Sequence, residues 1–324
     1  MLVDRLRLFP LLRFMWPQIF GFTLWSACVV VLHTLGHYPE RFGVEAGLLT
    51  ELSDWLAWTS VGIPFSAIAA LGGALAIFLG FRNNSAYDRW WEGRKIWGAL
   101  VNDSRSWARQ VIAWCGTGRG RAEPPGIELR RELIHRHLAF VHALVHHLRG
   151  EPVLLREAVG RFLSSDEAKA VGATPNALTA LLIQQGRRVA QARDAEQIEH
   201  FRHLAMDEML TRLSDIQGRC ERIKNTPLPR QYDAFPRWFA FIYGTLLPFG
   251  LVEPIGWGTV PISVVITWIF LCLEASGRVI ENPFTTHPAA LPLTSLSLVI
   301  ERDLRAALAE PVPDAAQPVN GILL

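Results

Sequence analysis

The chain has 324 residues, half of them hydrophobic and 19% charged, and its formal net charge is +2. So small a net charge gives no indication of nucleic-acid binding. The four widely spaced cysteines contain no CxxC pair, so they support neither a zinc ribbon nor a disulfide-stabilised scaffold. Because hydrophobic and charged residues are both abundant, they must be segregated along the chain, and the composition predicts a membrane part beside a water-exposed part.

Four uncharged stretches predict membrane-spanning helices, because an apolar run of about 20 residues is long enough to cross a bilayer. They are Phe14–Leu35, Trp55–Phe81, Trp238–Val252 and Pro254–Leu273. The third stretch has only 15 residues and joins the fourth through a predicted tight turn at GLVEPIGWG. We therefore expect four spans, of which the third is short and shielded from lipid by its neighbours.

The distribution of Lys and Arg predicts the orientation of these spans. The N-terminal segment and region 82–235 are rich in Arg, whereas the loop between the first two spans has Arg41 as its only base. We expect a multi-pass protein of the inner (plasma) membrane with both termini in the cytoplasm. The predicted parts are 1–81 (N-terminal segment and two spans), 82–235 (cytosolic helical region), 236–276 (two spans) and 277–324 (cytosolic C-terminal tail).

Region 82–235 has apolar residues at helical spacing. Helices are expected over Leu129–Leu148, Asn176–Ala190 and Ala195–Ile223, and no segment alternates in the period of a β-strand for long. The predicted fold class is an all-α membrane protein with four transmembrane helices and a large helical cytosolic region.

The second span passes without a linker into a segment rich in Arg and Trp, FRNNSAYDRWWEGRKIWGALVNDSRSWARQ, which begins at Phe81. We expect one long helix across this junction. Its aromatic and charged residues suggest anchoring at the membrane–water interface and ion pairs within the helix or between subunits. The expected anchors are Trp90, Trp91 and Trp97, and the expected pairing residues are Asp88, Arg89, Glu92 and Arg94.

Three motifs resemble the bestrophin family in its bacterial branch. They are LGFRNNSAYDRWWEGRKIWGALVNDSR at the second span, DIQGRCERIKNTPLP before the third span, and IENPF after the fourth. Their order and spacing match the family over nearly the whole chain. The resemblance implies a homopentameric ion channel in which the second membrane helix of each subunit lines a narrow neck. It also implies a second constriction near the cytosolic exit.

The resemblance assigns the neck to every fourth residue ending at the Phe of LGF, which gives Gly73, Ile77 and Phe81. Residues at this spacing share one face of a helix. Rings of apolar side chains gate a pore by dewetting, because an ion cannot pass without its water. The family usually has a bulky apolar residue at the position of Gly73, so we expect a wider outer ring here.

A different register remains open. Counting from Ile63-Pro64 gives Ile63, Ala67 and Leu71 as the lining residues. The small residues of this span, including Gly72, are also typical of plain helix packing in membranes.

The cytosolic constriction implied by the resemblance falls at Leu204, counted back from the Cys of DIQGRC. Ala205 and Glu208 are the neighbouring alternatives. A buried leucine of an ordinary helix bundle is the competing interpretation.

Ion selectivity must come from charges outside the apolar rings. The outer mouth carries Glu51 and Asp54, and a negative entrance concentrates cations within a Debye length, about 8–10 Å at physiological salt. Arg82 and Arg89 follow the neck, and we expect Asp88 and Glu92 to pair with them. The sequence therefore favours monovalent cations, with chloride as the alternative.

No cofactor or metal is predicted. Asn282-Pro283-Phe284 resembles the segment that precedes the calcium-binding acidic run of animal bestrophins, but no carboxylate follows before Glu301, so calcium lacks ligands. Five histidines on one predicted helix indicate a solvated basic face rather than a zinc site: His135, His137, His142, His146 and His147. Nothing indicates an enzyme. The competing class is a membrane-anchored scaffold.

Overall fold

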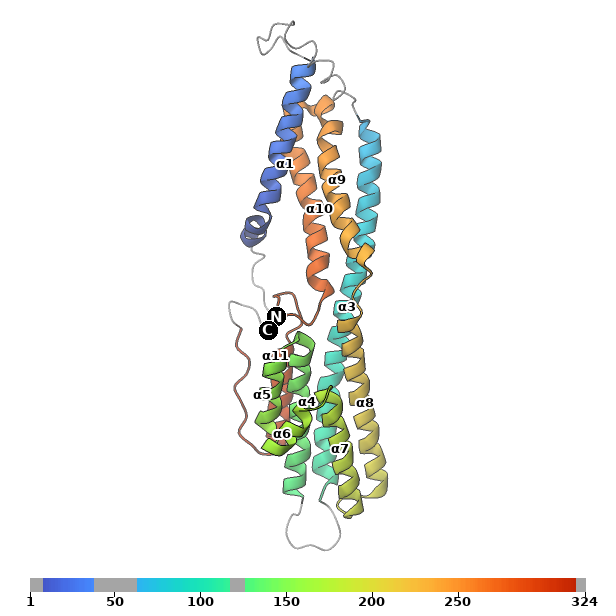
Figure 1. Ribbon diagram of the computed structural model, residues 1–324, viewed down its shortest axis with the longest axis vertical. Helices are drawn as coiled ribbons and strands as arrows, with labels where there is room; N and C mark the ends of the chain where they lie inside the picture. The colour runs from blue at the N-terminus through green and yellow to red at the C-terminus, as the bar shows by residue number, and fades with distance from the viewer. Residues whose placement is uncertain (1–7, 38–62, 117–125, 319–324) are drawn as a thin grey trace. The chain divides into compact units, whose positions relative to one another are not determined.

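The computed structural model describes residues 8–37, 63–116 and 126–318, and within these ranges every regular element is a helix. This confirms the all-α prediction for the part of the chain that is described. The helices are α1 (Leu8–His37), α3 (Phe65–Trp114), α4 (Ile127–Arg149), α5 (Pro152–Phe162), α6 (Ser165–Gly172), α7 (Ala177–Asp194), α8 (His200–Asn225), α9 (Arg230–Ile255), the 3₁₀ turn η2 (Gly256–Gly258), α10 (Thr259–Glu281) and α11 (Leu293–Ala307) (Figure 1).

Helix α3 has 50 residues and contains both the apolar run and the Arg- and Trp-rich segment. The prediction of one helix across this junction is confirmed. The helix begins directly after Pro64, and no proline lies inside it to interrupt the backbone hydrogen bonds. Residues 55–62, which belong to the same predicted span, lie outside the described residues.

The described residues form two compact units. The first, which we call the span unit, contains residues 8–37, 63–87 and 228–279. The second, the bundle unit, contains residues 88–116, 126–227 and 280–318. Helix α3 contributes its first part to the span unit and its remainder to the bundle unit.

In the span unit, α1, α9 and α10 lie side by side (Figure 1) and are joined by polar and aromatic contacts. The Ser26 and Ser263 hydroxyl oxygens are 2.8 Å apart, and the Trp25 indole donates to the Thr245 carbonyl at 2.9 Å. Three segments of the described residues are long and apolar enough to cross a membrane: Met15–Leu35, Phe65–Trp114 and Ala234–Glu281. The last contains both α9 and α10.

The third predicted helix is longer than expected. Helix α9 has 26 residues and begins at Arg230, before the uncharged stretch, and Pro236 and Pro248 lie inside it. The prediction took the first uncharged residue as the start of the helix. A helix can begin earlier, because charged and polar residues are compatible with a helical backbone when its apolar face is packed. The predicted turn is present, since Gly256 has a positive φ of 52° and begins η2.

The bundle unit has a large apolar core built on α3, α4, α7, α8 and α11. Trp97 and Trp107 of α3 are fully buried in it. Helix α4 matches the predicted helix closely and ends at Gly150, whose positive φ of 74° provides the left-handed cap. Helices α5, α6 and α11 are additional to the prediction, and α11 adds Ile300 and Leu304 to the core from the segment expected to be a tail.

Helix α8 starts at His200, five residues later than predicted. Helix α7 extends to Asp194, and Glu196 then adopts a positive φ of 57°, which separates the two helices. Asn176 caps α7 by accepting from the backbone nitrogens of Leu178 and Thr179.

Candidate functional site

One face of α3 is packed within the span unit. Ile68, Leu75, Leu79 and Arg82 are all at most 5% exposed. Their spacing of 7, 4 and 3 residues keeps them on one side of a helix. On the same side, a Cβ atom at Gly72 would lie 2.8 Å from the Tyr243 hydroxyl oxygen, so α9 approaches α3 closely there.

The opposite face carries the three predicted neck residues. Ile77 is 64% exposed and Phe81 is 66% exposed. A Cβ atom at Gly73 would meet nothing within 4 Å. Because successive residues turn by about 100°, the centre of this face lies about 180° from the buried side. No other segment among the described residues of the single chain therefore covers these three positions.

The composition of this open face differs from the other exposed apolar faces of the span unit. Its neighbouring exposed members are small: Ser66, Ala69, Ala70 and Gly80. Several exposed residues of α9 and α10 are large and apolar: Trp238, Phe239, Ile242, Ile262, Val265 and Ile269. Small residues are typical of faces where membrane helices approach one another. The open face of α3 therefore resembles a helix-contact face with two bulky residues.

The alternative register lies on a neighbouring part of the helix surface. Ile63 is half-buried and Ala67 is exposed. Leu71 is 51% exposed and lines an apolar recess of about 390 Å³ together with Phe239 and Tyr243 of α9. Leu71 thus lies on the part of the α3 surface next to α9.

Leu204 lies on the exposed face of α8 and is 52% exposed. The buried face of that helix carries Met206, Leu213 and Ile216 instead. A plain core position for Leu204 is therefore wrong. Of the two alternatives, Glu208 is exposed and shares the face of Leu204, whereas Ala205 is half-buried.

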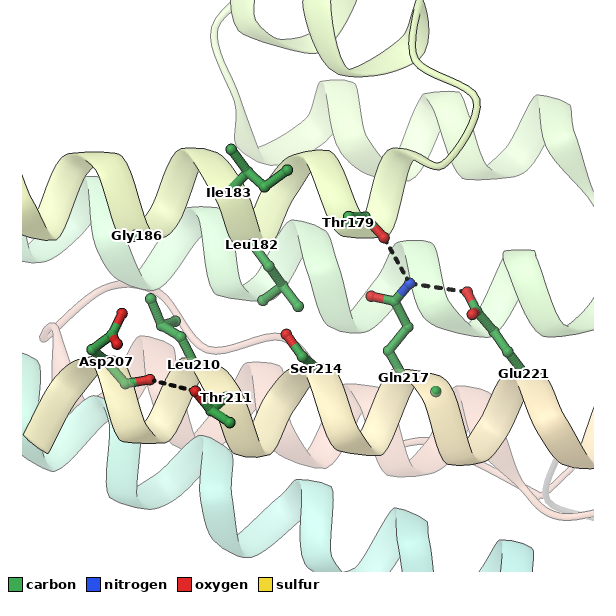
Figure 2. A pocket seen from close by; sticks show the side chains of 11 residues that line it. Thr179, Leu182, Ile183, Gly186, Asp207, Leu210, Thr211, Ser214, Gln217 and Glu221 are labelled. Carbon is green, nitrogen blue, oxygen red and sulfur yellow. Dashed lines mark hydrogen bonds between the residues drawn. The ribbon is translucent and has the colours of Figure 1, made fainter.

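A polar recess of about 480 Å³ lies beside this face, between α7 and α8 (Figure 2). The Gln217 side-chain nitrogen donates to the Thr179 hydroxyl of α7 at 3.1 Å and to the Glu221 carboxylate of α8 at 2.9 Å (Figure 2). The bond to Thr179 joins the two helices behind the face of Leu204.

The arginines that follow the predicted neck residues bind backbone carbonyls. Arg82 is fully buried and donates to the backbone carbonyls of Glu274, at 3.1 Å, and Tyr232, at 3.2 Å. Arg89 donates to the carbonyls of Ile223, Thr226 and Glu281. Among the described residues neither arginine pairs with Asp88 or Glu92, and backbone carbonyls distant in sequence accept from both guanidinium groups. Pairing between subunits stays a prediction. Glu92 pairs instead with Arg222 at 2.5 Å.

The tryptophans of the junction do not act alike. Trp97 is fully buried in the core of the bundle unit, so its predicted role as an interface anchor is wrong. Trp90 is half-buried and its indole nitrogen donates to the Ala289 carbonyl at 3.0 Å. Trp91 remains 45% exposed. Glu51 and Asp54, the predicted outer vestibule, lie outside the described residues.

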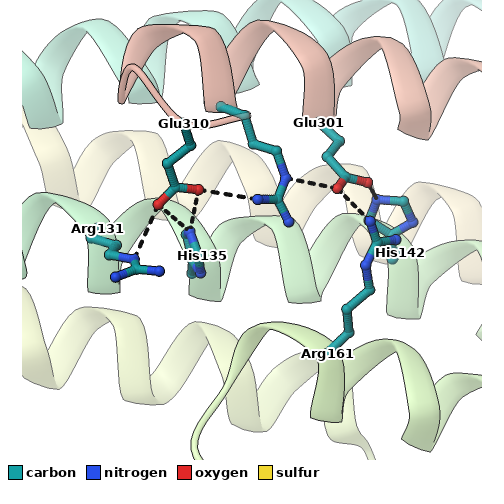
Figure 3. Close-up of polar contacts among 7 residues, drawn as sticks. Arg131, His135, His142, Arg161, Glu301 and Glu310 are labelled. Atoms are coloured by element: carbon teal, nitrogen blue, oxygen red, sulfur yellow. Dashed lines mark hydrogen bonds and ion pairs between the residues drawn. The ribbon is translucent and has the colours of Figure 1, made fainter. Parts of the chain in front are cut away.

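The five histidines of α4 are not a solvated basic face. His135 contacts the Glu310 carboxylate at 2.9 Å and His142 contacts that of Glu301 at 2.9 Å. Arg131, Arg161 and Arg305 complete this network between α4, α5 and the α11 region (Figure 3). Glu301 is fully buried, and burial alone would raise the pKa of its carboxyl group, but the hydrogen bonds from its basic neighbours outweigh burial and lower that pKa.

The other three histidines have separate partners. His146 contacts Glu151 and His147 contacts Glu221. His137 is 2% exposed, its Nε2 lies 2.9 Å from the Ser104 hydroxyl, and burial lowers its pKa to about 3. Among the described residues, no three His, Cys, Asp or Glu side chains group as metal ligands.

The Asn282-Pro283-Phe284 segment packs within the bundle unit. Phe284 is 4% exposed, and a Cβ atom at Gly93 of α3 would lie 3.3 Å from its ring. The Leu291 nitrogen donates to the Pro283 carbonyl at 2.8 Å. The segment thus holds the start of α11 beside α3.

Comparison with known proteins gives consistent results. Residues 11–306 match the family described as bacterial and fungal bestrophin protein. A voltage-dependent anion channel-forming protein from Ralstonia nicotianae is 37% identical over 275 residues, which are 84% of this chain and 87% of that protein. A protein of the same description from Mesorhizobium japonicum is 33% identical over 92% of this chain and 86% of its own length. A crystal structure of a bacterial bestrophin homolog from Klebsiella pneumoniae has a TM-score of 0.76 at 26% identity, covering 92% of this chain and 99% of that chain.

Proposed function

Because the chain belongs to the bacterial and fungal bestrophin family, a family of ion channels, we propose that it forms a homopentameric channel for monovalent ions. The neck is lined by Gly73, Ile77 and Phe81 of five α3 helices. The resemblance predicted from the three motifs is confirmed. The relatives are named for channel formation, which favours a channel over a membrane-anchored scaffold or an enzyme.

The observation that carries the proposal is the position of Ile77 and Phe81 opposite the packed side of α3. Two bulky apolar side chains, each almost two-thirds exposed, lie there among small residues. Five such faces around an axis allow close helix approach, with the large side chains pointing into the gap. Rings of this kind pass water and ions only when wide enough to stay wet.

In the membrane topology we propose, α1, the first part of α3, α9 and α10 each cross the inner membrane. The hairpin at Gly256 separates the last two crossings, and residues 82–235 and 277–324 are cytosolic with both termini. The segments long and apolar enough to span support this arrangement. The cytosolic constriction is assigned to Leu204, which is exposed on α8 although it is large and apolar.

For selectivity we favour cations. Glu208 and Asp215 are exposed on the face of α8 that carries Leu204, and neither has an ion-pair partner within the described part of the chain. Arg82 is buried and Arg89 is half-buried, and both guanidinium groups donate to backbone carbonyls rather than standing free on the open face of α3. An anion-selective pore is the second candidate, because the curated relatives are named as anion channel-forming proteins.

The proposal is tested by ion flux into liposomes that contain the purified protein. Ile77→Ala and Phe81→Ala should each raise flux per assembled channel, because removing bulk weakens the dewetting barrier. Leu71→Ala is the matched control from the other register and should leave flux unchanged. An impermeable wild-type protein would support the scaffold, and an effect of Leu71→Ala alone would support the register of Ile63.

A further inference from the structure

Two polar residues directly after Phe81 turn into the span unit. Arg82 is fully buried, although a charged side chain is costly to bury without hydrogen-bond acceptors. Neither residue belongs to the exposed stripe of Gly73, Ile77 and Phe81. Both directly follow Phe81 in the chain, so the contacts that they make affect how Phe81 is oriented.

Both residues bind the backbone of the same helix. Arg82 Nη1 donates to the Glu274 carbonyl at 3.1 Å, and Asn83 Nδ2 donates to the Leu273 carbonyl at 2.9 Å. Consecutive residues of α3 thus bind consecutive carbonyls of α10. These oxygens lie inside α10, and each carbonyl has a second lone pair to accept an extra bond. Arg82 Nε adds a bond to the Tyr232 carbonyl near the start of α9.

Gly277 of α10 leaves the space for this contact. A Cβ atom there would lie 1.9 Å from Asn83 Oδ1 and 2.6 Å from Arg82 Nη1. Any larger residue must displace the two side chains, because real Cβ atoms do not approach so closely. Gly277 lies one turn after Leu273, so the open space and the acceptor carbonyls belong to one side of α10.

We propose that Arg82, Asn83 and Gly277 form a positioning contact, the α3–α10 contact, that fixes the rotation of α3 at Phe81. A helix turns about 100° per residue, so a side chain held at Arg82 determines the direction of its neighbour. Arg82 is bound to α10, and the ring centroids of Phe78 and Tyr232 are 5.8 Å apart. Because the residues on both sides of this turn are fixed, Phe81 is held on the open face. This inference rests on the proposed neck. It adds three residues, Arg82, Asn83 and Gly277, which affect the ion only by orienting Phe81.

The test compares Asn83→Ala and Gly277→Ala in two backgrounds. In the otherwise unmodified protein each should raise flux per assembled channel by up to about fivefold, because the loss of one neutral hydrogen bond shifts the equilibrium between held and released orientations of Phe81 by about that factor. In a Phe81→Ala background, neither should change flux further, because the side chain they orient is absent. Gly21→Ala of α1, where a Cβ atom meets nothing within 4 Å, is the control and should have no effect in either background.

Assembly and the thermal unfolding midpoint are measured for every variant, because a merely structural role would lower them without coupling to position 81. If Gly277→Ala does not assemble, Asn83→Ala decides alone. Equal flux changes in both backgrounds, or none in the first, would overturn the positioning role. If Phe81→Ala itself has no effect, the proposed neck fails as well, so the two failures are distinguishable.

Discussion

Gly72 and Gly73 are neighbours in α3 that face opposite surroundings. A Cβ atom at Gly72 would lie 2.8 Å from the Tyr243 hydroxyl oxygen, whereas one at Gly73 would meet nothing within 4 Å. Gly72 is therefore a packing residue, because α9 needs its missing side chain. Gly73 has no such role within the described part of the chain, so its small size matters to whatever lies beyond the open face.

This difference predicts opposite outcomes for the two glycines. Gly73→Ile should lower ion flux, because five added side chains narrow the outer ring of the neck and favour its dewetting. The pentamer should assemble normally. Gly72→Ala is the matched control: it should reduce the yield of assembled protein by displacing Tyr243. Liposome flux together with the detergent-solubilised mass measures both, and a normal flux for assembled Gly73→Ile would contradict the neck.

Ion flux should not depend on calcium. The segment after Phe284 has no carboxylate until Glu301, and Glu301 is buried in contact with His142, Arg161 and Arg305. Calcium sites need several accessible oxygen ligands. Conductance measured in a chelator and in micromolar calcium should therefore be equal. A steep rise with calcium would refute the prediction.

Neutralising the outer acids should lower cation conductance. Glu51→Gln with Asp54→Asn removes two charges per subunit from the proposed entrance, and the loss should be greatest at low ionic strength, where the Debye length exceeds about 10 Å. Asp166→Asn, an exposed acid of α6, is the control and should have no effect. A reversal potential that follows the chloride gradient in the unmodified protein would establish the anion-selective alternative instead.

Acid should destabilise the protein through His137. Burial keeps the folded-state pKa at about 3, whereas the unfolded chain titrates near 6.5. Below pH 6.5 the unfolded state therefore binds a proton that the folded state does not, so stability falls as pH falls, by about 1.6 kcal/mol between pH 6.5 and 5. His137→Leu should remove this part of the pH dependence of unfolding. His200→Leu, at an exposed position, should leave it unchanged.

The sequence predicted the features that depend on local periodicity. The helix through the junction at Phe81 and the open face of Ile77 follow from the uncharged run and its four-residue spacing, because side chains at this spacing share one side of a helix. The packed side was not predicted in detail. Arg82 was expected to pair with a nearby acid, whereas its carbonyl acceptors lie 150 and 192 residues away in the chain.

Long-range packing also explains the wrong predictions. A tryptophan in a polar helix segment suits both an interface and a core, and only the fold of the bundle unit determines that Trp97 is buried. The partners of His135 and His142 come from the region of α11, which the sequence pattern did not mark as a packed helix. The sequence feature that could have predicted the α3–α10 contact is Gly277, a glycine inside α10 that leaves room for Arg82 and Asn83.

The proposed position of Phe81 in a pore neck is tested most directly by thiol modification. Phe81 and Trp238 are both 66% exposed in the single chain, so exposure does not separate a pore residue from a lipid-facing one. Phe81→Cys and Trp238→Cys are made in a background where Cys28 and Cys272 are replaced by Ala, and single-channel current is recorded before and after a charged, membrane-impermeant thiol reagent. The account predicts a large change of current for Phe81→Cys and none for Trp238→Cys. An unchanged current for fully modified Phe81→Cys would contradict it.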